Sequence, residues 1–125
     1  MEISLKQISS WFLVVFWAVA GICHFVFPDI YIQVIPEWLG DAAILNTVAG
    51  ITELLIAGLA VFNATRKWSG ILAIITLTTF IVAHVYFIQL GSCISEFCIP
   101  QWIAWLRLIL IHPLLIFWAY RVSKR

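Results

Sequence analysis

The chain has 125 residues, enough for one domain, with 64% apolar and 10% charged residues and a formal net charge of +1. An ordinary soluble domain has about 25% charged residues, and a soluble core of this size cannot bury so much apolar surface. The composition therefore excludes a soluble globular protein, and the small net charge gives no indication of nucleic-acid binding. We expect an integral membrane protein that forms a single transmembrane domain over residues 1–125.

Four apolar segments follow one another, each with the length of a membrane-spanning helix. A helix needs about 20 residues to cross roughly 30 Å of hydrocarbon. The segments cover about residues 8–27, 41–63, 68–90 and 101–121. Because the linkers between them are short, neighbouring helices should run antiparallel. The expected fold class is all-α, an integral membrane antiparallel four-helix bundle.

The charged residues between these segments are sorted by sign. The basic ones all fall on one side of the helix array, at Lys6, Arg66, Lys67, Arg121, Lys124 and Arg125. The loops on the other side carry acidic residues without Lys or Arg, at Asp29, Glu37, Asp41 and Glu96. The positive-inside tendency therefore predicts a multi-pass protein of the cell (inner) membrane with both termini cytoplasmic.

The loop after the first segment has a helical pattern of its own. Pro28 should end the first helix. Over residues 29–39, Ile30, Val34 and Trp38 recur every four residues, which is typical of a short amphipathic segment in the outer interface. It could serve as a lid over an outward-opening pocket or as a connector that packs against lipid, and we expect the connector.

Ionisable residues interrupt all four apolar segments, at His24, Glu53, His84, Arg107 and His112. Such residues are costly in hydrocarbon and usually face the bundle interior. Glu53 falls near the middle of its segment and is too short to reach either interface. Small residues surround it on its helix, which favours close helix contact. We therefore expect an inward polar cluster, with Arg107 as the partner of Glu53 and His84 as the next candidate.

This cluster has two interpretations, which the residues leave open. It could lock the helices together in an environment that supplies no hydrophobic drive between them. It could also bind a polar headgroup such as a quinone carbonyl and relay protons, since histidine titrates near neutral pH. His112 has a local alternative, because Pro113 frees the carbonyl of Ile109 and the imidazole could satisfy it. The histidines show no ligand spacing, so no metal site is expected.

Four residues separate Cys93 from Cys98 in a short loop on the expected outer side. Oxidising conditions there permit a disulfide, which would staple the loop that enters the fourth helix. A redox-active pair beside a quinone pocket is the alternative. The spacing is not the CxxC of redox motifs, and no Lys or Arg in the loop would lower a thiol pKa.

These marks together resemble the DoxX family of small four-helix membrane proteins. The resemblance rests on Gly21-Ile-Cys-His24-Phe25-Val-Phe-Pro28, Ile35-Pro36 before Trp38-Leu39, Gly50-Ile-Thr-Glu53 with Gly58, and Trp105-Leu-Arg107-Leu108 running on to Leu114-Leu-Ile-Phe-Trp118-Ala-Tyr120. It spans about residues 17–120. The chain departs from the family pattern at His84, where Asn is more common, near His112, where Gln is common, and in having the cysteine pair. The resemblance implies a redox setting.

Our sequence-based hypothesis is a redox-associated membrane subunit with a pocket for a quinone or another small apolar ligand, lined by the buried ionisable residues. Its partners would be the lipid bilayer and a soluble or membrane redox protein, and the chain could form a homo-oligomer. The alternative is a non-catalytic assembly or scaffold factor whose polar cluster is structural. The sequence does not decide whether the chain is an enzyme or a non-catalytic subunit of a membrane oxidoreductase.

Overall fold

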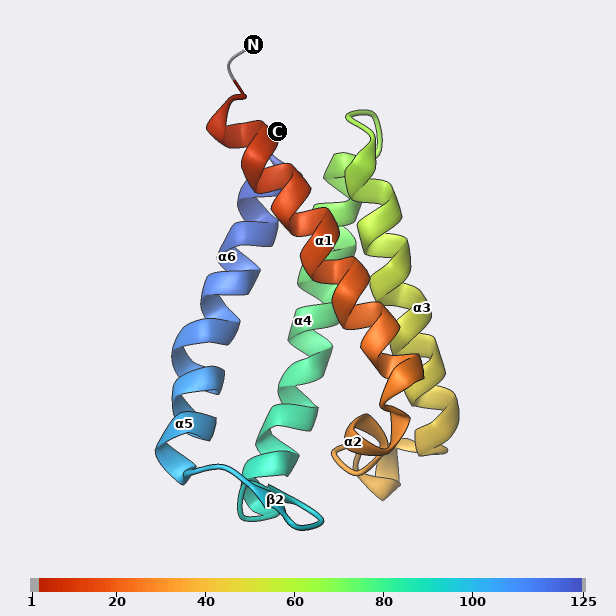
Figure 1. Ribbon diagram of the computed structural model, residues 1–125, viewed down its shortest axis with the longest axis vertical. Helices are drawn as coiled ribbons and strands as arrows, with labels where there is room; N and C mark the ends of the chain where they lie inside the picture. The colour runs from red at the N-terminus through yellow and green to blue at the C-terminus, as the bar shows by residue number, and fades with distance from the viewer. Residues whose placement is uncertain (1–2, 125) are drawn as a thin grey trace.

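The structure is a computed structural model that describes residues 3–124, so Arg125 lies outside the described residues. Four long antiparallel helices dominate it (Figure 1). They are α1 (Leu5–Val26), α3 (Ala42–Val61), α4 (Arg66–Gln89) and a fourth helix assembled from α5 (Gln101–Leu106), the π-helical η2 (Arg107–Ile111) and α6 (His112–Ser123). All four are long and apolar enough to cross a membrane. The expected all-α membrane bundle is confirmed.

The helices pack in chain order, α1 against α3, α3 against α4, and α4 against α6. Both termini lie at one end, which we call the terminal end, and we call the other the hairpin end (Figure 1). At the terminal end Trp118 of α6 donates its Nε1–H to Ser9 Oγ of α1 at 2.9 Å, and its ring packs against Phe12 and Phe16. Toward the hairpin end α1 and α5 diverge (Figure 1).

Small residues allow the neighbouring helices to approach closely. A Cβ placed on Gly50 of α3 would lie 2.9 Å from the Cβ of His24 on α1, and one on Gly21 of α1 would lie 3.0 Å from the carbonyl oxygen of Gly50. On α4, a Cβ at Gly70 would lie 2.7 Å from the carbonyl oxygen of Ala119 on α6. Close backbone approach through small residues is how membrane helices gain contact without a hydrophobic drive.

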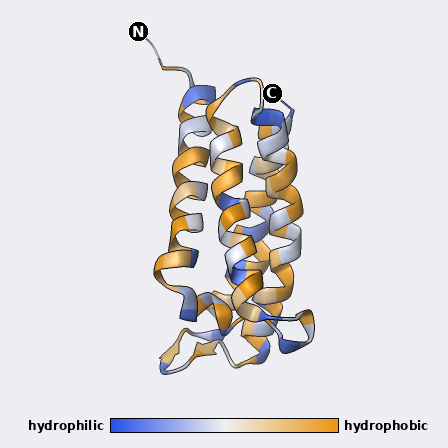
Figure 2. Cartoon of the chain, turned by 90° about the vertical axis from the view of Figure 1, so that its right-hand side faces the viewer, coloured by the Kyte–Doolittle hydropathy of each residue, from blue (hydrophilic) through white to orange (hydrophobic). Residues whose placement is uncertain are grey.

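The outer surface of the bundle is apolar, as lipid contact requires. Hydrophobic residues cover most of the long helices, while hydrophilic residues concentrate near the two ends and at a few inner positions (Figure 2). The buried apolar core consists mainly of residues that face the inside of the bundle, at Leu13, Trp17, Ile56, Ala57, Ala60, Ala73, Leu77, Ala119 and Val122.

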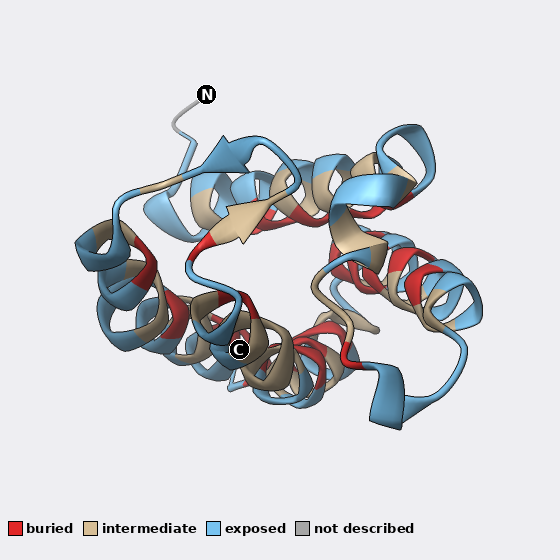
Figure 3. Ribbon diagram, turned by 90° about the horizontal axis from the view of Figure 1, so that it is seen from below, coloured by how far each residue is buried: buried red, intermediate tan, exposed pale blue. Residues whose placement is uncertain are grey.

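Two short segments lie at the hairpin end (Figure 3). One contains α2 (Pro28–Ile32) and the 3₁₀ turn η1 (Glu37–Leu39), so the expected interfacial segment is helical only in parts. The other is a hairpin of β1 (Cys93–Ile94) and β2 (Phe97–Cys98), which the sequence did not predict. Ser95 Oγ donates to Gln33 Oε1 at 2.9 Å and ties the hairpin to the turn after α2.

Candidate functional site

The five ionisable residues predicted to form one cluster separate into two groups on different helix pairs. His24 and Glu53 meet between α1 and α3, and we call them, with Asn46, the first cluster. His84, Arg107 and His112 lie between α4 and the fourth helix, and we call them the second cluster. The two groups must therefore be considered separately.

Each polar side chain of the first cluster is buried and has a partner. His24, Asn46 and Glu53 are only 5%, 3% and 4% exposed. His24 Nδ1 lies 2.6 Å from Asn46 Oδ1, and Asn46 Nδ2 donates to the backbone carbonyl of His24 at 3.0 Å. On the other side of the ring, His24 Nε2 lies 3.1 Å from Glu53 Oε2. One imidazole thus joins two positions on α3, two helical turns apart.

The amide of Asn46 fixes where the protons of His24 sit. Because its NH₂ group donates to the His24 carbonyl, its oxygen faces Nδ1, and Nδ1 must carry a hydrogen. One proton then lies between His24 Nε2 and Glu53 Oε2. Either it is on Nε2, which makes an imidazolium that faces a carboxylate, or it is on Glu53, which makes a carboxylic acid that faces a neutral imidazole. Both arrangements have no net charge, which suits a low-dielectric interior.

The expected pairing of Glu53 with Arg107 is wrong. Glu53 pairs with His24, on the helix that α3 packs against through Gly21 and Gly50. Arg107 lies on the fourth helix, which packs against α4 instead. The position of a residue within its apolar segment gives its depth in the membrane, but it does not show which helix faces contact each other.

Two residues of the first cluster's surroundings were missed by sequence reasoning. Asn46 precedes Glu53 by seven residues, two helical turns, and therefore shares its face of α3; that spacing was the available signal. Tyr31 of α2 stacks on His24 with ring centroids 3.8 Å apart and planes at 27°. Burial, with smaller effects of Cys23 and Glu53, raises the pKa of Tyr31.

The stacking of Tyr31 also corrects the expected role of the loop after α1. Ile30 and Trp38 are exposed, as a lipid-facing connector would have them. Tyr31 instead turns inward and covers the first cluster from the hairpin end. A pure connector packed against lipid is therefore the wrong description of this segment.

The second cluster differs because its cation, Arg107, has no ion pair among the described residues, whereas Glu53 of the first cluster faces His24. The rings of His84 and His112 are in edge contact, with centroids 4.7 Å apart and planes at 70°. The guanidinium of Arg107 lies over the ring of Phe87, 5.1 Å from its centroid. Within residues 3–124, Arg107 Nε is buried and has no hydrogen-bond partner. A buried charged donor left unpaired is costly, so it marks a place that could take an acceptor.

His112 ties the fourth helix to α4. Its Nε2 is hydrogen-bonded to the backbone carbonyl of Leu77, which can only accept, so Nε2 carries the hydrogen and Nδ1 of the neutral ring is an acceptor. The imidazole therefore reaches across to α4 and does not serve the carbonyl of Ile109 on its own helix, as the sequence had suggested. The π-helical turn η2 lies just before Pro113, and such turns occur often at functional sites.

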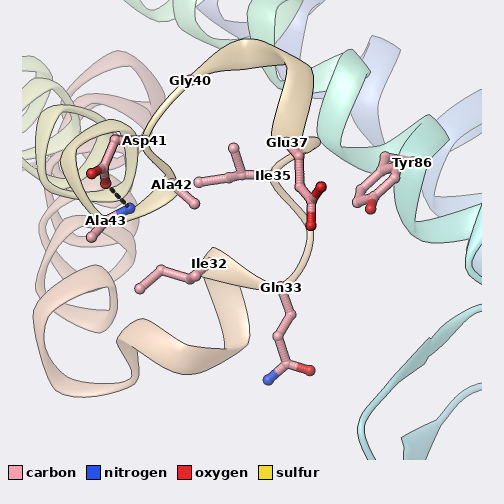
Figure 4. A pocket seen from close by; sticks show the side chains of 9 residues that line it. All are labelled: Ile32, Gln33, Ile35, Glu37, Gly40, Asp41, Ala42, Ala43 and Tyr86. Atoms are coloured by element: carbon pink, nitrogen blue, oxygen red, sulfur yellow. Dashed lines mark hydrogen bonds between the residues drawn. The ribbon is translucent and has the colours of Figure 1, made fainter.

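A separate pocket of about 500 Å³ opens at the hairpin end (Figure 4). It lies between the loop that carries η1, the start of α3, and Tyr86 of α4, and the Glu37 carboxylate points toward the Tyr86 ring. Asp41 is occupied as the N-cap of α3, accepting from the backbone N–H of Ala43 at 2.9 Å. None of the five predicted site residues lines this pocket.

The predicted disulfide is present between Cys93 and Cys98, which stand opposite each other in the hairpin. Cys98 is exposed at the hairpin end, whereas Cys23 of α1 is a free thiol. Within residues 3–124, no three His, Cys, Asp or Glu side chains are grouped as metal ligands.

Comparison with known proteins places the chain in a family without adding a function. No curated protein and no solved structure matches it. One family model matches residues 13–123, a range that contains both clusters, α2 and the disulfide hairpin. The chain belongs to this family, which is described as Domain of unknown function (DUF8561).

Proposed function

We propose that this protein is a DoxX-like, redox-associated membrane subunit that binds a quinone-type headgroup, or a similar small apolar ligand with a carbonyl acceptor, at the second cluster. The observation that carries the proposal is the buried Nε of Arg107, which has no hydrogen-bond partner among the described residues. A ligand carbonyl would accept that hydrogen bond. The buried ring of Phe87, in contact with the guanidinium, makes the surroundings of Arg107 apolar, which suits a ligand that is mostly apolar.

The two histidines give this site a way to handle protons. Reduction of a quinone to a quinol takes two electrons and two protons. The imidazole of His112 is in edge contact with that of His84, and imidazole nitrogens can accept and donate protons. The electrons would come from a soluble or membrane redox partner. In this proposal Arg107 orients the headgroup, and His84 and His112 pass protons to its oxygens.

The first cluster favours a structural role beside that site. His24, Asn46 and Glu53 contact one another, so both ring nitrogens of His24 are occupied and the Glu53 carboxylate faces the imidazole. This mutual pairing also supports the second candidate function, a non-catalytic assembly or scaffold factor whose polar contacts only hold the helices together. The two functions differ in whether the second cluster binds anything.

The charge distribution supports a placement in the cell (inner) membrane with both termini cytoplasmic. Lys67, Lys124 and the other described basic residues lie at the terminal end or, as Arg107, within the bundle, and the positive-inside tendency assigns the terminal end to the cytoplasm. The disulfide hairpin would then face the outer side, where conditions permit oxidation.

Quinone binding to the purified protein in lipid nanodiscs tests the proposal. A short-chain quinone is titrated while the quenching of tryptophan fluorescence is recorded. We expect saturable binding that Arg107→Gln weakens about tenfold, because one hydrogen bond from a charged donor is lost. Arg121→Gln, a matched removal of an arginine outside the cluster, should leave the affinity unchanged. No saturable quenching with the unchanged protein would favour the scaffold factor.

The redox state of the cysteine pair is a second readout of the same proposal. Free thiols are blocked in native membranes, disulfides are then reduced and labelled, and the assay is repeated with quinone depleted and restored. An exchangeable pair would pass two electrons and two protons from its thiols to a quinone as the disulfide re-forms. A labelling ratio that follows the quinone pool would place Cys93 and Cys98 in that path, whereas a constant oxidised pair is a structural staple.

A further inference from the structure

A groove of about 360 Å³ lies at the terminal end, between the start of α4 and the end of α6. It is lined by Lys67 and Ile71 of α4 and by Tyr120, Ser123 and Lys124 of α6. None of these residues belongs to either polar cluster. The groove thus brings two ammonium groups from different helices to one depression at the edge of the apolar bundle.

The charge around this groove is positive and is not balanced by described carboxylates. The acidic residues among residues 3–124 lie in the hairpin-end loops or, for Glu53, inside the bundle. Two arginines of the same end contact groups outside the groove lining: Arg66 donates to the carbonyl of Ala60 at 3.1 Å, and Arg121 lies over the ring of Phe117. The Lys124 ammonium lies over the ring of Tyr120, 5.4 Å from its centroid, and that ring itself lines the groove. The two lysines therefore supply the positive charge of the groove itself.

The surface that continues from the groove toward the middle of the bundle is apolar. On α4, Ile75 follows Lys67 and Ile71 at a spacing of four residues, so the three share one face. On α6, Phe117 lies one turn before Tyr120 on the same face. Ile75 and Phe117 are 58% and 57% exposed. The charged groove at the membrane edge could hold a lipid headgroup, and the exposed apolar surface beside it could contact the acyl chains of the same lipid.

We propose that this groove binds the phosphate of an anionic phospholipid headgroup between Lys67 and Lys124, with the acyl chains along Ile75 and Phe117. Lysine stems can lie along apolar surface while their ammonium groups reach the headgroup region. Basic pockets between membrane helices attract anionic headgroups by this chemistry. The close approach of α4 and α6 at Gly70 keeps the two sides of the groove at a fixed separation. This site is independent of the quinone proposal.

Native mass spectrometry of the full chain in mild detergent tests the site, with phosphatidylglycerol and phosphatidylcholine titrated separately. We expect retained phosphatidylglycerol and much weaker phosphatidylcholine binding. Lys124→Gln should weaken phosphatidylglycerol binding about fivefold, and Lys67→Gln with Lys124→Gln about 25-fold. Arg121→Gln removes the same charge from the same helix, three residues from Lys124 and outside the groove lining. Because it only uncovers more of the Phe117 ring and leaves both lysines in place, it should change binding less than twofold.

Three outcomes would overturn the assignment. Equal losses for Lys124→Gln and Arg121→Gln would mean a diffuse charge effect without a site. Equal retention of phosphatidylcholine would remove the requirement for an anionic headgroup. Inorganic phosphate is the third arm: displacement of phosphatidylglycerol by millimolar phosphate would identify a site for the free anion, whereas failure to displace it supports a lipid that uses both the charge and the apolar track.

Discussion

Side chains from three segments converge on His24, and each uses a different part of the imidazole. Asn46 takes Nδ1, Glu53 takes Nε2, and Tyr31 covers the ring face. No polar atom of the ring is left for a ligand. At Arg107 the opposite holds, since its Nε is buried without a partner among the described residues. Buried polar side chains thus have two roles in this bundle: those around His24 pair across helices, whereas Arg107 keeps an unpaired donor among the described residues.

A double-mutant cycle should detect the coupling between His24 and Glu53. His24→Leu and Glu53→Leu each leave a buried polar partner uncompensated, and each should cost about 3 kcal/mol of unfolding free energy. The double variant should cost clearly less than the sum, because the pair of Nε2 and Oε2 is removed whole and only Asn46 Oδ1 loses its donor. The same cycle for Glu53 and Arg107 should be additive to within about 0.5 kcal/mol. Unfolding in mixed micelles measures both, and strong coupling of Glu53 to Arg107 would contradict the helix arrangement.

Arg107→Leu should not destabilise the protein in the absence of ligand. The guanidinium is a desolvated charge without a hydrogen bond at Nε, so an apolar replacement removes a cost and loses only the contact with Phe87. We expect the thermal midpoint in detergent to stay the same or to rise, while quinone binding is lost. His24→Leu is the control for a structural polar residue. A large drop in the midpoint for Arg107→Leu would assign Arg107 to the structure and weaken the proposed function.

At the scale of elements, segment lengths and composition were enough to predict the four helices. Hydropathy placed the ends of α1, α3, α4 and the fourth helix to within a few residues, since burial in lipid demands a fixed length of apolar chain. The lateral arrangement was not predictable in the same way. All four helices are apolar on most of their surface, so periodicity does not mark which face meets which neighbour.

The hairpin and the inward turn of α2 were missed for a related reason. The hairpin contains only two residues in each strand, too few for an alternating pattern, and its connection places Ser95 at φ +53°, where glycine would be the usual signal. Tyr31 has the composition of an interfacial aromatic residue, and only the path of the chain after Pro28 brings it onto His24. Tertiary contacts decided both features.

Gly70→Ala should separate α4 from α6. The new Cβ would lie 2.7 Å from the backbone oxygen of Ala119 and 2.7 Å from the backbone nitrogen of Ser123, so the backbones themselves must move apart. Overpacking of this kind costs about 1–3 kcal/mol. Gly58→Ala is the matched control, because a Cβ there meets nothing within 4 Å, and it should be neutral or slightly stabilising. Equal thermal midpoints for the two variants would show that the helices are not in close contact at Gly70.

For the whole molecule, the two ends of the bundle have different chemistry. The hairpin end carries the loop carboxylates, the disulfide and the α2 segment over the first cluster. The terminal end carries the lysine groove and the contact of Trp118 with Ser9. The second cluster lies between them, on the helix pair that does not contain the first cluster. The proposals for quinone and for lipid thus concern opposite halves of one bundle.

The side of the membrane on which each end lies can be tested with variants that each carry one new cysteine, made in a Cys23→Ser background. Ala64 and Glu37 are exposed, in the α3–α4 turn of the terminal end and in η1 at the hairpin end. In sealed right-side-out membrane vesicles, a membrane-impermeant maleimide should label Glu37→Cys at once and Ala64→Cys only after permeabilisation, because the basic end is expected inside. The reverse pattern would move the lysine groove to the outer leaflet and the disulfide hairpin to a reducing compartment. Since a stable disulfide and a predominantly anionic leaflet are expected on opposite sides of the membrane, only the first pattern is compatible with both features of this chain.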